Sequence, residues 1–86
     1  MLVGKVVGSV VSTRKNEKLV GSKFMIVEPV DSMAKGRFVA VDNIGAGIGE
    51  YVLVATGSAA RCSTDCETSP VDAAIVGIID DPTGLE

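Results

Sequence analysis

Three glycines at alternate positions, Gly45, Gly47 and Gly49, form the spacing in this chain that most suggests chemistry. Glycine allows a backbone to approach a ligand closely, and glycine-rich loops cradle phosphate groups. A dinucleotide fingerprint would place its third glycine at position 50, where the chain has Glu50, and would continue into a helix. A β-rich run over residues 51–54 follows instead, and no Lys-Ser or Lys-Thr closes a phosphate loop. The pattern therefore favours a tight turn over a phosphate site.

The two cysteines, Cys62 and Cys66, are four residues apart, which on a helix would place both sulfurs on one face. A zinc or iron–sulfur site needs about four ligands. The chain has no histidine and no other cysteine, so we expect no metal and no cofactor. We interpret the pair as free thiols with an incidental role, with a redox-sensitive pair as the alternative.

The residues for acid–base catalysis are also sparse. Histidine, the commonest general base, is absent, and no two of the candidate carboxylates have a spacing that pairs them: Glu28, Glu50, Asp42 and Asp72. Asp42 and Asp80 follow apolar runs and are predicted to form turns by accepting backbone hydrogen bonds. Asp72 is expected to bind a loop backbone or Arg61, and Arg61 either anchors a carboxylate across an interface or is solvated. The sequence therefore predicts that the protein is not an enzyme.

Composition limits the possible partners. The 86 residues allow one domain, residues 1–86. The net charge is −3 and the basic residues are scattered, which argues against nucleic acid; the charged run at residues 13–18 is interpreted as a solvated loop. No apolar run is long enough for a membrane span, and the N-terminus lacks a signal-peptide pattern, so a cytoplasmic location is expected. Hydrophobic residues make up 47% of the chain but only three are aromatic, which suggests that some apolar surface is buried against a partner.

The elements that would position these residues are short strands. Strands are predicted over residues 1–12, 23–27, 37–42, 50–56 and 71–80, with a helical turn over residues 58–63 that has Ser58 as its N-cap. Five short strands separated by turn signals indicate an all-β fold, a small closed barrel. Residues 1–12 are apolar on both faces, so the face outside such a barrel is expected to meet a neighbouring subunit.

Four segments together resemble one known family: GKVVGSVVST at residues 4–13, VDNIGAGIGEYVLV at 41–54, GSAAR at 57–61 and PVDAAIVGIID at 70–80. In this order and spacing they are similar to the bacterial microcompartment vertex family, which includes the EutN-type and CcmL-type proteins. The resemblance extends from Leu2 to Asp80. The Cys62–Cys66 segment matches no motif of that family, and Leu85-Glu86 is a dipeptide that often precedes an affinity tag.

The resemblance implies an OB-like five-stranded barrel that assembles into a ring, a homopentamer. Such pentamers occupy the vertices of a polyhedral shell built mostly from hexameric shell proteins, supply its curvature and leave a small central opening. They have no catalytic role or cofactor, and they lie in the microcompartment shell in the cytoplasm. The residues expected at a subunit contact or at the opening are Gly45, Ala46, Gly47, Gly49, Glu50, Ser58 and Arg61. The alternative is an OB-like binding module for nucleic acid or a small ligand, which the three aromatic residues and negative charge disfavour.

Overall fold

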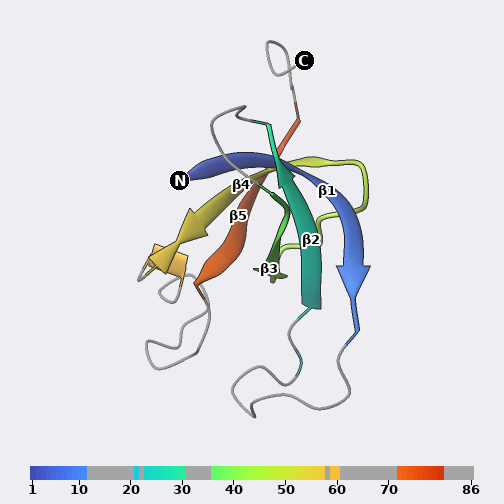
Figure 1. Cartoon of the computed structure of the whole chain (residues 1–86), viewed down its shortest axis with the longest axis horizontal. Coiled ribbons are helices and arrows are strands. Elements are labelled where there is room, and N and C mark those ends of the chain that lie inside the picture. The colour runs from blue at the N-terminus through green and yellow to red at the C-terminus, as the bar shows by residue number, and fades with distance from the viewer. Residues whose placement is uncertain (12–20, 22, 31–35, 58, 61–71, 81–86) are drawn as a thin grey trace.

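Five strands close into a barrel in the computed structural model, which describes residues 1–11, 21, 23–30, 36–57, 59–60 and 72–80 (Figure 1). The strands are β1 (Leu2–Val10), β2 (Lys23–Pro29), β3 (Phe38–Asp42), β4 (Tyr51–Thr56) and β5 (Ala73–Ile79). Around the barrel their order is β1-β2-β3-β5-β4, with β4 returning to β1. The predicted all-β, five-stranded OB-like barrel is confirmed.

The pairing of β1 closes the barrel, because this strand is antiparallel to both β2 and β4. Its register with β2 shifts between Val6 and Gly8, an irregularity of the kind that bends a strand, and β1 curves over the barrel in Figure 1. The parallel pairing of β3 with β5 is much shorter and is limited to Val41↔Ala74 and Asp42↔Ile75. The first residues of β3 therefore have no partner on β5.

Each observed strand begins and ends within two residues of its predicted bounds. Strand β2 continues past residue 27 to Pro29, which pairs with Gly4; a proline is tolerated there because a terminal strand position can dispense with its N–H group. The predicted helical turn is confirmed at Ala59 and Ala60, while its predicted N-cap, Ser58, lies outside the described residues. Gly57, which leads into the turn, has a φ of 63° and not the negative φ of a right-handed helix. The helical residues that the structure describes form no segment long and apolar enough to cross a membrane.

The interior of the barrel is filled mainly by valine. Val6, Val27, Val52 and Val54, from β1, β2 and β4, are completely buried. Met25, Ala40, Ala46, Ala73 and Ile75 complete the buried cluster, and Leu2, Phe38 and Ile78 pack against it from partly buried positions. Branched and small side chains fit the narrow interior of a five-stranded barrel, which explains why the chain folds with so few aromatic residues.

A second, smaller cluster lies on the outside of the barrel. Val41 pairs with both Phe24 of β2 and Ala74 of β5, and the fully buried Ala60 of the helical turn packs with this row. The chain therefore covers part of its own outer apolar surface. On the outer side of β1, Val3 and Val7 remain only half-buried.

Candidate functional site

The loop between β3 and β4, residues 43–50, contains most of the predicted site residues, and its first half is organised by Asp42. This last residue of β3 is only 2% exposed. Its Oδ1 accepts hydrogen bonds from the N–H groups of Ile44 and Gly45 at 3.0 and 3.1 Å. Its Oδ2 accepts one from the N–H of Ala46 at 2.9 Å. The prediction that Asp42 forms a turn by accepting backbone bonds is confirmed. We call residues 43–50 the glycine loop.

The second half of the glycine loop is held by Glu50 and by β1. Glu50 Oε1 accepts from the N–H of Gly47 at 2.6 Å, while the Glu50 N–H donates to Gly47 O at 3.1 Å. The loop is also tied to β1, where Gly49 N–H donates to Val6 O at 2.7 Å and Val6 N–H donates to Glu50 O at 2.9 Å. Both ends of the loop are thus fixed to the barrel.

These bonds give a physical reason why the glycine loop is not a phosphate cradle. A phosphate-binding loop directs several consecutive N–H groups at its ligand. Here the N–H groups of residues 44–46 are directed at the Asp42 carboxylate and that of Gly47 at Glu50. The protein's own carboxylates occupy the places that a bound anion would take.

The side chains of the glycine loop alternate between the core and solvent. Ala46 is buried in the barrel core, whereas Ile44 and Ile48 on either side of it are 45% and 67% exposed. The glycine spacing, from which this loop was predicted, does not indicate these two isoleucines. The signal that could have found them is the Ile-Gly-Ala-Gly-Ile pattern, in which two large apolar residues flank a small one.

The three glycines of the loop are not equivalent. Gly45 and Gly49 have φ angles of 87° and 95°, which only glycine adopts readily, whereas no such angle occurs at Gly47. A Cβ atom at Gly47 would lie 3.2 Å from Glu50 Oε1, the end of a flexible side chain.

We therefore expect Gly49→Ala to lower the free energy of unfolding by about 1–2 kcal/mol, the cost of a left-handed backbone for an L-residue. Gly47→Ala should cost less than about 1 kcal/mol, because at most one exposed hydrogen bond is perturbed. Chemical denaturation of both variants at one protein concentration measures the difference. Equal losses in the two variants would contradict this assignment of the backbone angles.

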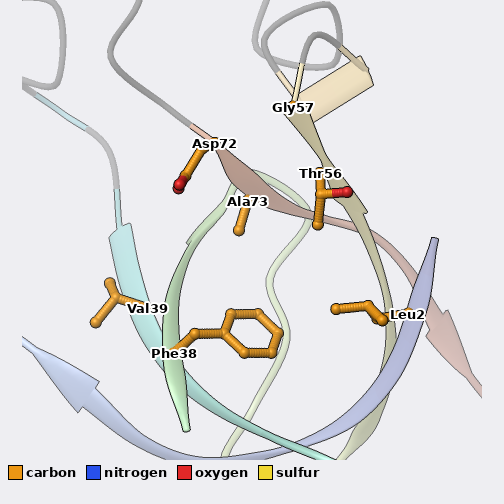
Figure 2. Close-up of a pocket in the computed structure, with 7 residues that line it drawn as sticks. All are labelled: Leu2, Phe38, Val39, Thr56, Gly57, Asp72 and Ala73. Atoms are coloured by element: carbon orange, nitrogen blue, oxygen red, sulfur yellow. The ribbon is translucent and has the colours of Figure 1, made fainter. Parts of the chain in front are cut away.

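On the side of the barrel away from the glycine loop, a cavity opens beside the short β3–β5 pairing (Figure 1). Gly57 N–H donates to Asp72 O at 2.9 Å and extends the β4–β5 ladder. The first residues of β3, by contrast, have no pairing partner on β5. A cavity of about 380 Å³ results, lined by Leu2, Phe38, Val39, Thr56, Gly57, Asp72 and Ala73. Figure 2 shows Phe38 and Leu2 pointing toward each other across it, with Thr56 and Ala73 at its edge. We call this cavity the side opening.

Other predicted site residues are separated from the glycine loop or lie outside the described part of the chain. Ser58, Arg61, Cys62 and Cys66 belong to the latter group, as does the predicted loop at residues 13–18. Asp72 lies at the side opening, where its main-chain oxygen accepts a hydrogen bond from the N–H group of Gly57. That its side chain binds a loop backbone or Arg61 stays a prediction. Among the described residues, no group of three or more acidic or sulfur-containing side chains has a geometry that could hold a metal.

The chain is similar in sequence to proteins of known function. The family model described as "Ethanolamine utilisation protein EutN/carboxysome" matches residues 1–80. The microcompartment shell vertex protein GrpN of Rhodospirillum rubrum is 48% identical over 83 residues, covering 93% of each chain. The carboxysome shell vertex protein CcmL of Synechococcus elongatus is 46% identical, covering 93% of this chain and 84% of its own.

Solved structures show the same likeness in three dimensions. One described as the ethanolamine utilization protein EutN has a TM-score of 0.87 at 42% identity, with 94% of this chain and 88% of the other covered. The R. rubrum GrpN structure, described as a pentameric microcompartment shell protein, has a TM-score of 0.82 at 45% identity, with 94% and 95% covered.

The closed five-stranded barrel is shared with solved microcompartment shell proteins. The relatives in sequence are shell vertex proteins, a class of structural proteins rather than enzymes. The chain belongs to the EutN/CcmL family of bacterial microcompartment shell vertex proteins. The predicted family is thereby confirmed, and the relatives support the shell function over the OB-like binding module.

Proposed function

We propose that this chain, as a single domain over residues 1–86, is a shell protein whose homopentamers close the vertices of a bacterial microcompartment. The observation that supports this most directly is the agreement with GrpN, which is a pentameric shell protein and matches nearly the whole chain in sequence and structure. The pentamer contacts hexameric shell proteins around each vertex, supplies curvature and leaves a small central opening. The shell is cytoplasmic and the protein needs no cofactor for this role.

The glycine loop is suited to a place in such a ring because it is rigid and narrow. Its backbone is tied to Asp42, Glu50 and β1, and its glycines keep it slim enough for close approach of another backbone. We propose that the glycine loop lies at a subunit contact or at the central opening of the ring, together with the helical turn that follows β4. The residues so placed are Gly45, Ala46, Gly47, Gly49, Glu50, Ser58 and Arg61.

Native mass spectrometry of the purified chain tests this function. The expected result is a dominant species of five times the 8.8 kDa chain mass at micromolar concentration. Dilution should convert pentamers to monomers without long-lived dimers, because a ring loses the benefit of closure when one subunit leaves. A dominant monomer at micromolar concentration, with the far-ultraviolet spectrum of a folded β-protein, would contradict the vertex function.

A further inference from the structure

In a ring, a large fraction of the surface of so small a protein is buried in subunit contacts. A stable interface buries about 800 Å² per partner, and a ring subunit makes two, or about 1,600 Å². The isolated chain exposes 5445 Å², so roughly three-tenths of its surface must be covered. The exposed apolar side chains are the parts of that surface that gain most from being covered.

A ring also needs two different patches, since one face of each subunit meets another face of the next. Among the described residues, the large apolar side chains classed as exposed are Met1, Val10, Val11, Val39, Ile44 and Ile48. Two of them, Ile44 and Ile48, lie together on the glycine loop. Val39 lines the side opening. In Figure 1 the glycine loop is on the right of the barrel, while the helical turn after β4 and the start of β5, which border the side opening, are on the lower left.

The two patches are complementary in shape and chemistry. Ile48 protrudes from a turn whose backbone is fixed on both sides of it, because Gly47 is bonded to Glu50 and Gly49 to Val6. Because this backbone is already fixed, the turn itself loses little conformational freedom when Ile48 binds. The side opening has an apolar interior with Leu2 and Phe38 across it, and the small Gly57 and Ala73 at its edge (Figure 2). Its 380 Å³ are ample for an isoleucine side chain.

We propose that Ile48, with Ile44 beside it, inserts into the side opening of the next subunit and forms the apolar centre of the ring contact. Thr56 and Asp72 then lie at the polar rim of that contact, the arrangement typical of protein interfaces. This inference rests on the proposed pentamer and adds to it the pair of surfaces that hold neighbouring subunits together.

Cross-linking tests the contact in the intact assembly. In a Cys62→Ser, Cys66→Ser background, Ile48→Cys and Val39→Cys are combined and treated with a short bis-maleimide linker. Each subunit then offers one thiol to each of its two neighbours, so a ladder of covalent species up to five chains is expected on a denaturing gel. Each single-cysteine variant should remain uncross-linked, and an equimolar reassembled mixture of the two should give dimers only.

A matched control pairs Val39→Cys with Val11→Cys. Val11 is as apolar as Val39 and 89% exposed but lies beyond the end of β1, past Val6, where this strand contacts the glycine loop. The register shift between Val6 and Gly8 also puts Val11 out of phase with the outer face of β1 at Val3 and Val7. This pair should give no ladder. A ladder from the control pair equal to that from the test pair, a product linked only within one chain, or no product while the unmodified protein is pentameric would each overturn the proposed contact. The absence of pentamers in the unmodified protein would instead overturn the proposed function.

Substitution provides a second measurement. Ile48→Asp should lower the pentamer fraction in native mass spectra at least tenfold at micromolar concentration, while Val11→Asp leaves it unchanged. Both positions are exposed, so the fold should survive in each variant, as circular dichroism can verify. A folded Ile48→Asp variant that remains fully pentameric would overturn the inference.

Discussion

Replacing Asp42 by alanine is expected to lower the free energy of unfolding by about 3 kcal/mol or more, because three backbone N–H groups lose their acceptor at once. These groups belong to residues 44–46, and the one on Ala46 is in a buried environment. The loss should also loosen the glycine loop, since the same bonds hold its first half to the end of β3. Urea denaturation at one fixed protein concentration measures the effect, because the stability of an assembling protein depends on concentration.

Asp42→Asn distinguishes the loss of acceptors from the loss of size. The asparagine oxygen can still accept from the N–H groups of Ile44 and Gly45, but its amide NH₂ would face the N–H of Ala46. A loss of roughly 1–2 kcal/mol is therefore expected. Glu28→Gln is the control, because the Glu28 carboxylate forms an exposed ion pair with Arg37 at 3.0 Å and such pairs contribute about 0–1 kcal/mol. Equal stability of all three variants would show that the carboxylate does not organise the loop.

Gly4→Ala is expected to be the second severe substitution, with a loss of about 3 kcal/mol or more, the upper end of the cost of overpacking a core. Gly4 is buried on β1 between Pro29 of β2 and Val52 of β4. A Cβ atom there would collide with Val27 Cγ1 and lie 3.0 Å from the main-chain oxygen of Glu28. A side chain can change rotamer, but a paired backbone oxygen can move only if the strands separate.

Gly8→Ala on the same strand is the matched control. Its added Cβ would lie 3.4 Å from Ile26 Cδ1, an ordinary contact with the end of a side chain. Because alanine also restricts the unfolded chain, this variant should be neutral or more stable by up to about 1 kcal/mol. Denaturation of the two variants side by side gives the comparison. A similar loss in both would mean that the spacing between β1 and β2 is looser than the structure indicates.

Much of the fold could be predicted from local pattern. Alternating or continuous apolar runs predict all five strands, and the end of β2 is predicted two residues before its observed end at Pro29. The role of Asp42 could be anticipated because a carboxylate directly after a strand commonly accepts bonds from the following turn. The helical turn after β4 could also be predicted, but local pattern does not indicate that Gly57 has a φ of 63° and donates its N–H group to the main-chain oxygen of Asp72.

The candidate site was predictable only as a segment. Three alternating glycines indicated the loop at residues 43–50, but they did not indicate that Gly47 has no unusual φ angle while Gly45 and Gly49 do. They also did not indicate that the Ile44 and Ile48 side chains are exposed. Whether a loop side chain points to the core or to solvent depends on how the loop returns to β1 at Val6, a residue more than 40 positions away.

The order of residues along the chain was thus sufficient for the five strands and the tight turn after Asp42, because these depend on neighbours a few positions apart. It was also sufficient for the family resemblance, which depends on four motifs in a fixed order. The side opening and the contrast between Gly4 and Gly8 depend instead on the register between strands. The opening exists because β3 meets β5 at only two residue pairs, and Gly4 is intolerant because β2 crosses it closely. Registers of this kind are set by packing between distant parts of the chain, and local alternation does not specify them.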